Sequence, residues 1–262
     1  MSEPNRHSNG PSAAFFDLDR TLISGSSAFV LGIAAWRGKL VPTHQFVRDA
    51  FSALDFVLSG ADDDTSTGVR DRILGAVTGV RLDDLVALNA DIVPKLIDRV
   101  RPESMRLLEQ HRDAGRATYI VSASPVELVE PLARALGMTA GIGTRSKIVD
   151  GTYTGELDGP FCYGEGKVEA IRELAEKEKF DLERCWAYSD SASDLPMLRA
   201  VGHAVAVNPD AKLERTAATE GWPIVEFHKR SKAVIRRTTQ AVAGIGLAAG
   251  GFATGIRYAR SR

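Results

Sequence analysis

The sequence has few cysteines and almost no net charge, and these two absences argue against several classes of protein. Its 262 residues include two cysteines, Cys162 and Cys185, and contain no Cys-x-x-Cys pair or Cys/His cluster. We therefore expect neither a disulfide framework nor a zinc site, and a reducing cytoplasm suits such a chain. The formal net charge of −1 gives no electrostatic attraction toward nucleic acid or another strongly charged partner.

The two ends of the chain differ from its middle. Residues 1–12 are polar and have no apolar stretch, so we expect a disordered leader and not a signal peptide. Residues 229–262 form a basic, Gly/Ala-rich tail in which positions 238–256 carry no charge. That run is just long enough to span a bilayer, but Gly and Ala give it little hydrophobic drive. Two alternatives stay open: a tail associated with a membrane, and a flexible tail or one that docks on the core.

The middle of the chain alternates between strand and helix patterns. It belongs to a composition that is 44% hydrophobic and 26% charged, an ordinary balance for a globular protein. The predicted strands are Ala13–Phe16, Ala117–Val121, Arg184–Tyr188, Ala204–Val207 and Pro223–Phe227. Repeated strand–helix alternation predicts an α/β fold with a doubly wound parallel sheet. Residues 142–156, which are rich in Gly and Thr, suit a hairpin instead.

A long helical segment interrupts this alternation after the first strand. Residues 28–100 show helical periodicity in several stretches and no convincing strand. About 75 helical residues are too many for a simple crossover between two strands. We therefore expect an inserted helical cap domain. The predicted boundaries are a leader at 1–12, a core at 13–24 and 101–228, a cap at 25–100 and a tail at 229–262.

Polar side chains gather where the predicted strands end. They are Asp17 and Asp19 after the first strand, Ser122 after the second, Asp190 and Asp194 after the third, and Lys167 at the start of a helix. Ligands of open α/β sheets bind at the carboxyl edge, where these positions converge. Four carboxylates in one crevice need a cation, and oxygen ligands favour Mg²⁺ over zinc. A lysine and a hydroxyl beside Mg²⁺ suit a phosphate group.

Each of these residues also has a common structural alternative. Asp17 and Asp19 could belong to an Asp-rich turn, and Ser122 could satisfy backbone groups in a turn. Lys167 could be a solvated lysine at the start of a helix. Asp190 and Asp194 could each be the N-cap of a helix. Short motifs are individually weak signals. The appearance of all of them in order, each at a strand end or helix start, is a much more specific signal.

With these residues the chain resembles the haloacid dehalogenase superfamily, and within it the phosphoserine-phosphatase-like hydrolases that carry a helical cap after the first motif. The resemblance covers about residues 13–228. Its four motifs appear in order as Asp-Leu-Asp-Arg-Thr (17–21), Val-Ser-Ala-Ser (121–124), Gly-Glu-Gly-Lys (164–167) and Tyr-Ser-Asp-Ser-Ala-Ser-Asp (188–194).

The resemblance implies roles for the residues of these motifs. Asp17 would attack phosphorus, and Asp19 would protonate the leaving oxygen and then activate water. The implied Mg²⁺ site consists of Asp17, Asp190 and the backbone carbonyl of Asp19, supported by Asp194. The implied phosphate contacts are Thr21, Ser122, Ala123 and Lys167.

The sequence also departs from the phosphoserine phosphatase pattern. Those enzymes are expected to carry a glutamate nine residues after the nucleophile, where this chain has Ser26. The two glycines after the motif serine are replaced by Ala123 and Ser124. Both changes argue against L-phosphoserine as the substrate, although Arg70 or Arg72 of the cap could recognise a substrate anion.

These observations lead to one hypothesis and two rivals. The hypothesis is a Mg²⁺-dependent phosphomonoester hydrolase that acts on a small phosphorylated metabolite through a phospho-Asp17 intermediate. The first rival is a phosphatase that acts on a phospholipid head group at a membrane, which the tail suggests. The second is a non-catalytic module that binds phosphorylated ligands, against which the intact pair of Asp17 and Asp19 argues. The sequence leaves the oligomeric state open.

Overall fold

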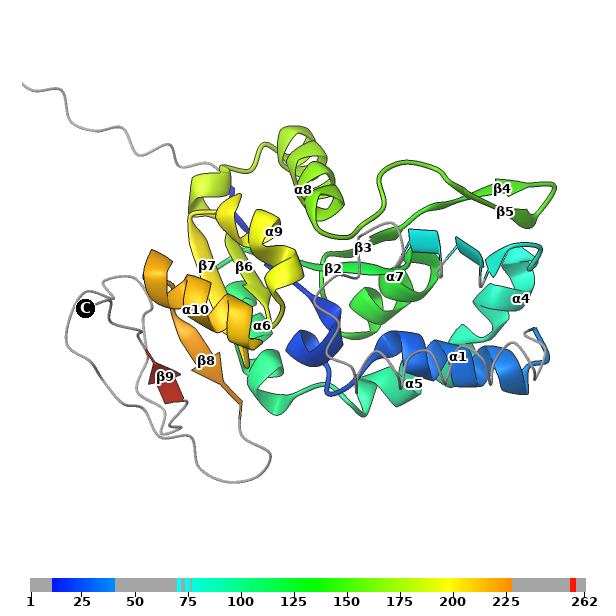
Figure 1. Ribbon diagram of the computed structural model, residues 1–262, viewed down its shortest axis with the longest axis horizontal. Helices are drawn as coiled ribbons and strands as arrows, with labels where there is room; N and C mark the ends of the chain where they lie inside the picture. The colour runs from blue at the N-terminus through cyan, green and yellow to red at the C-terminus, as the bar shows by residue number, and fades with distance from the viewer. Residues whose placement is uncertain (1–10, 41–69, 72–73, 76, 228–254, 258–262) are drawn as a thin grey trace, which may run out of the picture.

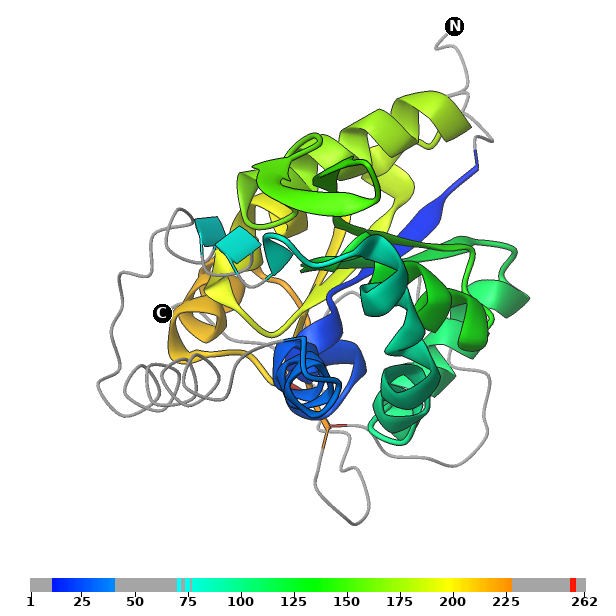
Figure 2. The same ribbon diagram turned by 90° about the vertical axis from the view of Figure 1, so that its right-hand side faces the viewer.

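A seven-stranded sheet with helices on both faces forms the centre of the molecule (Figures 1 and 2). The computed structural model describes residues 11–40, 70–71, 74–75, 77–227 and 255–257. In spatial order the strands are β3 (Ala140–Thr144), β2 (Ala117–Pro125), β1 (Ala13–Phe16), β6 (Trp186–Ser189), β7 (His203–Val207), β8 (Ile224–Glu226) and β9 (Gly255–Arg257). The first six pair in parallel, and β9 runs antiparallel to β8. The predicted doubly wound α/β class is confirmed.

Strand β1 lies in the middle of the sheet and contributes to both hydrophobic faces. All four of its residues are at most 1% exposed, and alternate side chains point to opposite faces. Phe16 belongs to the apolar cluster of one face and Phe15 to that of the other. On the Phe16 side the covering helices include α6 (Pro102–Asp113) and α7 (Val126–Ala135). On the Phe15 side they are α8 (Glu165–Glu178), α9 (Leu195–Arg199) and α10 (Ala211–Glu220).

The segment inserted after β1 is helical where the structure describes it. Its helices are α1 (Ser27–Arg37), α4 (Leu82–Ala87) and α5 (Asn89–Ile97), which lie on the right in Figure 1. Val30 of α1 and Ile92 of α5 join the same apolar cluster as Phe16. A tight turn at Leu88, whose N–H bonds to the Leu85 carbonyl at 3.2 Å, separates α4 from α5. Residues 70, 71, 74, 75 and 77 are helical, and positions 41–69 of the expected cap lie outside the described residues.

The two crossings between this insertion and the sheet lie side by side. Ile23 and Val100 form an antiparallel bridge. On either side of it, the Ser24 N–H donates to the Arg99 carbonyl at 2.8 Å, and the Arg101 N–H donates to the Leu22 carbonyl at 3.1 Å. The chain therefore leaves and re-enters the core through one hydrogen-bonded pair of strands.

Residues 140–157 form two different structures. Strands β4 (Ser146–Val149) and β5 (Thr152–Leu157) pair as the antiparallel hairpin expected within 142–156. The preceding segment, β3, joins the main sheet in parallel with β2, which the hairpin prediction missed. The hairpin contacts the insertion, because Tyr153 packs against Val77 and Leu85 and its N–H donates to the Val80 carbonyl at 3.0 Å.

A buried histidine lies within the Phe16 side of the core. The His111 ring of α6 is 4% exposed, and its Nε2 lies 2.8 Å from the Tyr188 hydroxyl. Tyr188 in turn stacks on Phe16 with ring centroids 4.5 Å apart. Burial lowers the pKa of His111 to about 3, and the neighbouring Arg116 and His203 add to this effect. The folded protein therefore holds His111 in its neutral form at all but strongly acidic pH.

The C-terminal tail contributes one strand to the sheet. The α/β pattern was expected to end by about Phe227, but β9 pairs with β8 through Ile256 and Val225, which corrects that expectation. Apart from Gly255 and Ile256, the uncharged run at 238–256 lies outside the described residues. Among the residues that the structure describes, no helix has both the length and the apolar character needed to cross a membrane.

Candidate active site

The candidate site lies at the carboxyl end of β1, where the strand order of the sheet reverses. The chain continues from β1 to β2 on one side and later returns to β6 on the other. The Asp17 N–H donates to the Tyr188 carbonyl of β6 at 2.9 Å. A short kinked helical turn, η1 (Leu18–Leu22), follows, in which Asp19 is extended and Arg20 has a φ of 59°. Ligands of open α/β folds bind at such a reversal point.

A buried lysine joins two of the predicted carboxylates. The Lys167 Nζ lies 2.7 Å from Asp17 Oδ1 and 2.8 Å from Asp194 Oδ2. The Ser189 hydroxyl also donates to Asp194 Oδ2, at 2.7 Å. Asp17 is 9% exposed, and Lys167 and Asp194 are 3% or less. Side chains from three separate motifs therefore meet in one buried ionic group.

The glycine before Lys167 is required by close packing. Lys167 is in the first turn of α8, and a Cβ atom on Gly166 would lie 1.8 Å from the backbone oxygen of Phe161. That distance is far below van der Waals contact, so residues with a side chain are excluded unless the backbone moves. Gly166 thus allows α8 to approach the preceding loop while Lys167 points into the site.

The buried carboxylates of this site outnumber its buried cation, Lys167. Burial raises the pKa of Asp17 above its usual range, against the opposing attraction of Lys167, and Asp194 and Asp190 raise it further. Burial disfavours the charged form of Lys167, but Asp17 and Asp194 outweigh it and raise the pKa of the lysine. Three buried carboxylates, Asp17, Asp190 and Asp194, therefore face one buried ammonium group.

Asp190 is paired with the arginine of the first motif. The Arg20 Nε donates to Asp190 Oδ2 at 2.6 Å, and Nη2 contacts the same oxygen. The Thr21 hydroxyl lies 3.4 Å from Oδ1. Burial raises the pKa of Asp190, and Arg20 opposes that rise. Within the described part of the chain, no three His, Cys, Asp or Glu side chains converge as a metal-ligand cluster.

Asp19 is held at the start of α1. Its Oδ1 accepts the Ser27 backbone N–H at 2.7 Å, and its Oδ2 accepts the Ser26 hydroxyl at 3.3 Å. Burial raises the pKa of Asp19, although the bonds from Ser27 and Ser26 favour the charged form. Asp19 therefore connects the kinked turn after β1 to the first helix of the insertion.

A chain of serines continues from this helix to the second motif. The Ser27 and Ser124 hydroxyls are 2.9 Å apart, and the Ser124 N–H donates to Ser122 Oγ at 3.2 Å. The Ala123 carbonyl accepts a bond from the Thr144 hydroxyl at 2.8 Å. Asp19 and Ser122, which are both predicted site residues, are linked in this way through Ser27 and Ser124.

The helix-capping alternative fails for the two aspartates of the fourth motif. Asp194 occupies the position before α9, but its side chain makes no capping hydrogen bond and instead contacts Lys167 and Ser189. Asp190 contacts Arg20 and Thr21. The cap bond next to them comes from Ser191, which accepts the Ser193 N–H.

The sequence analysis missed several side chains of this site. Arg20 and Ser189 stand beside predicted residues within the motifs, yet neither was assigned a contact. The bond between Ser27 and Ser124 joins residues that are distant in sequence, so a single sequence carries no local signal for it. Of the two cap arginines considered, Arg70 bonds to its neighbour Asp71, and Arg72 lies outside the described residues.

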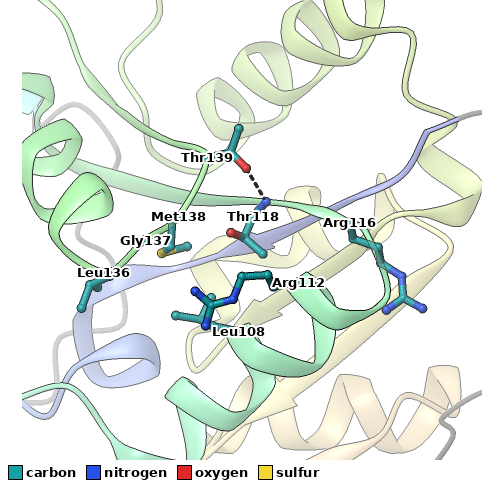
Figure 3. A pocket seen from close by; sticks show the side chains of 8 residues that line it. All are labelled: Leu108, Arg112, Arg116, Thr118, Leu136, Gly137, Met138 and Thr139. Atoms are coloured by element: carbon teal, nitrogen blue, oxygen red, sulfur yellow. Dashed lines mark hydrogen bonds between the residues drawn. The ribbon is translucent and has the colours of Figure 1, made fainter.

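A separate cavity of about 250 Å³ lies away from the candidate site, near the start of β2. Figure 3 shows Arg112 extending toward Gly137 across it, while Arg116 points away from it. The guanidinium of Arg116 lies 4.0 Å from the Trp186 ring. The lining residues are Leu108, Arg112, Arg116, Thr118, Leu136, Gly137, Met138 and Thr139. No residue of the four motifs lines this cavity.

Comparison with known proteins identifies relatives that cover most of the chain. Residues 14–199 match the model of the haloacid dehalogenase-like hydrolase family. A phosphoserine phosphatase of Mycobacterium tuberculosis is 40% identical over 258 residues, which cover 95% of this chain and 82% of that protein. An inhibition of morphological differentiation protein of Streptomyces azureus is 41% identical over 225 residues, with 85% and 81% covered. A crystal structure of a Bordetella pertussis protein of unknown function superposes with a TM-score of 0.71 at 25% identity, covering 82% of this chain and 97% of that one.

Proposed function

The chain belongs to the haloacid dehalogenase-like hydrolase family, and we propose that it is a Mg²⁺-dependent phosphomonoester hydrolase that acts on a small phosphorylated metabolite through a phospho-Asp17 intermediate. Its phosphatase relatives identify it as a phosphoric monoester hydrolase. The metal dependence, the covalent intermediate and the residue roles are the parts proposed here. The observation that carries them is the buried contact of Asp17 with Lys167 at the reversal point of the sheet.

Asp17 is the proposed nucleophile. Its carboxylate oxygen would form a bond to phosphorus while the bond between phosphorus and the leaving oxygen breaks. Lys167, 2.7 Å from Asp17 Oδ1, is well placed to hold both the carboxylate and a phosphoryl oxygen as negative charge accumulates. Thr21, Ser122 and Ala123 are the other proposed contacts of the phosphoryl group.

Asp19 is the proposed general acid and base. Burial raises its pKa, which favours a protonated carboxyl group that can donate to the leaving oxygen. The same group, once deprotonated, would take a proton from the water that hydrolyses the acyl phosphate on Asp17. The Ser27 N–H and the Ser26 hydroxyl orient its two oxygens, so the position of α1 bears directly on the geometry of proton transfer.

The residues present fit a magnesium ion. The donor set is all oxygen, from the carboxylates of Asp17 and Asp190 and the backbone carbonyl of Asp19, and magnesium sites commonly use only one or two carboxylates. Asp194 Oδ1 is buried and has no hydrogen-bond partner, which suits a neighbour that orients a metal-bound group. A bound Mg²⁺ would neutralise the charge that develops on the phosphoryl oxygens.

The proposed substrate is a small phosphomonoester other than L-phosphoserine. A relative at 40% identity is named a phosphoserine phosphatase, but Ser26 occupies the position where a glutamate is expected to bind the substrate ammonium group. Ser26 is engaged with Asp19 and also accepts the Phe29 N–H at 3.4 Å. We propose that residues 25–100 act as the cap that selects the leaving group, while residues 13–24 and 101–228 carry the chemistry.

Turnover of p-nitrophenyl phosphate by Asp17→Asn tests this proposal. A carboxamide is a poor nucleophile, so the folded variant is expected to lose at least a thousandfold in kcat. Asp91→Asn is the matched control, because it removes a surface carboxylate that pairs with Lys95 and should leave kcat unchanged. Activity of Asp17→Asn within tenfold of the wild type would remove Asp17 as the nucleophile. A wild-type protein that binds phosphate esters without turnover would favour the non-catalytic module.

A further inference from the structure

We propose that Arg20 is an internal counter-ion of Asp190, which competes with a divalent cation for this carboxylate. The inference rests on the proposed function in one respect, namely that the cation uses Asp190. It goes beyond that function because it assigns a role to a side chain that neither metal ligation nor phosphate binding requires.

The first support is the way in which Asp190 is occupied. Two nitrogens of the Arg20 guanidinium contact Oδ2, with Nε at 2.6 Å. Thr21 lies 3.4 Å from Oδ1. The charge-assisted donor holds Oδ2, so a cation at Asp190 would use Oδ1 and share the carboxylate with Arg20.

The second support is the exposure of the two partners. The Asp190 side chain is 4% exposed, whereas that of Arg20 is 60% exposed. The guanidinium therefore reaches a buried carboxylate from the rim of the site. A side chain in that position can turn into solvent without disturbing the core, unlike Lys167, which is buried.

The third support is the backbone at position 20. Arg20 has a φ of 59°, in the left-handed region that glycine and asparagine adopt more readily than arginine. A long cationic side chain is thus present where the backbone alone would favour a small residue. The ion pair with Asp190 is a reason for an arginine at position 20.

The three buried carboxylates of the site already have cationic partners. Lys167 compensates Asp17 and Asp194, and Arg20 compensates Asp190. A dication on Asp190 Oδ1 would repel the guanidinium on Oδ2, so the two cations compete for one carboxylate. Binding of Mg²⁺ therefore weakens the ion pair with Arg20, and the ion pair lowers the apparent metal affinity.

Calorimetric titration of the metal-free protein with MgCl₂ tests the competition. Arg20→Asn removes the charge, and asparagine tolerates the left-handed backbone. The variant is expected to bind Mg²⁺ about three- to tenfold more tightly than the wild type, because loss of one partly exposed charge-assisted contact changes a binding constant by about that factor. Arg134→Asn is the matched control. Its guanidinium pairs with Glu130 on the surface of α7, so its Kd should equal that of the wild type.

Thermal unfolding with and without Mg²⁺ distinguishes this role from a merely structural one. Arg20→Asn is expected to lower the Tm of the metal-free protein and to leave the Tm at saturating Mg²⁺ close to that of the wild type. A structural role would lower both values equally. Arg20→Lys, which keeps the charge but loses the fork geometry, should give a Kd between those of the wild type and Arg20→Asn.

The outcomes separate this inference from the proposed function. Unchanged or weaker Mg²⁺ binding by Arg20→Asn, or an equal loss of Tm in both states, overturns the role of Arg20 alone. A wild-type protein that binds no Mg²⁺ and hydrolyses p-nitrophenyl phosphate in a chelator overturns the proposed metal dependence and this inference with it. If Arg20→Asn does not fold, Arg20→Lys decides, and an affinity no higher than that of the wild type contradicts the inference.

Discussion

Replacement of His111 by glutamine should change how the stability of the protein responds to acid. The ring is buried and lies 2.8 Å from the Tyr188 hydroxyl, and burial lowers its pKa from 6.5 to about 3. In the unfolded chain the ring keeps its ordinary pKa. Between these two values the unfolded state binds a proton that the folded state does not, so the contribution of His111 to stability is present above pH 6.5 and is lost as the pH falls toward 3.

The magnitude follows from the pKa difference. Each pH unit below 6.5 costs about 1.4 kcal/mol until the folded-state pKa is reached. At pH 5.0, the wild type should have lost about 2 kcal/mol through His111 alone. This is a substantial share of the 5–15 kcal/mol that is typical of folded domains.

Urea unfolding of the wild type and His111→Gln at pH 7.5 and 5.0 measures this effect. Other groups titrate in both proteins, so the difference between the two free energies of unfolding isolates His111. Glutamine cannot be protonated. The free energy of unfolding of His111→Gln, relative to that of the wild type, should therefore rise by about 2 kcal/mol between pH 7.5 and 5.0, whatever the substitution costs at pH 7.5. His203→Gln serves as the control. Because His203 is exposed, its replacement should change the pH dependence of the free energy of unfolding by a smaller amount. A wild-type-to-variant difference that is the same at both pH values would refute the reasoning, since it would mean that the folded protein accepts the proton.

Three further predictions concern the proposed activity and the tail. Chelation with EDTA should abolish turnover of p-nitrophenyl phosphate and added Mg²⁺ should restore it, because the carboxylates of Asp17, Asp190 and Asp194 outnumber their cationic partners, Lys167 and Arg20. Full activity in a sample shown by elemental analysis to be metal-free would contradict this. L-phosphoserine should have a kcat/KM at least tenfold below that of the best phosphomonoester in a panel. Ser26 offers no charge to an ammonium group, and a charge-assisted contact contributes about 1.5–3 kcal/mol. If L-phosphoserine has the highest kcat/KM in the panel, this prediction is wrong. A chain shortened to end at His228 should keep its kcat toward p-nitrophenyl phosphate, since every proposed catalytic residue precedes position 195. It should lose any binding that the full chain shows to anionic liposomes. An unfolded product would show that the tail is part of the core.

The elements that the sequence predicted well are those whose pattern is local. Strand β1 is a continuous apolar run, all of it buried, and it was located to the residue. The strand β3 was missed because its Ala-Gly-Ile-Gly-Thr sequence has few apolar side chains, and its place depends on close approach to α7. A Cβ on Gly141 would lie 2.5 Å from the Val129 carbonyl oxygen. Helix α10 was missed because it buries little beyond Leu213 and Ala217.

The candidate site shows the same difference between local sequence patterns and contacts that depend on the fold. Asp17, Lys167 and Asp194 could be assigned from motif order, and the structure brings them together. The partner of Asp190 could not be predicted, because the direction of the Arg20 side chain depends on the kinked turn and on a carboxylate 170 residues away. Contacts between residues distant in sequence need the fold before they can be inferred.

The short strand β9 has a consequence for how molecules of this protein associate. The outer edge of β8 would otherwise present unpaired backbone groups, and such an edge invites pairing with another chain. Residues 227–254 separate β8 from β9, so the covering strand is supplied from far along the sequence. A strand joined by so long a connection fits the same edge whether it comes from its own molecule or from a neighbour, which is the condition for domain swapping. An exchanged arrangement would gain from a higher protein concentration by mass action, whereas the pairing within one molecule would not.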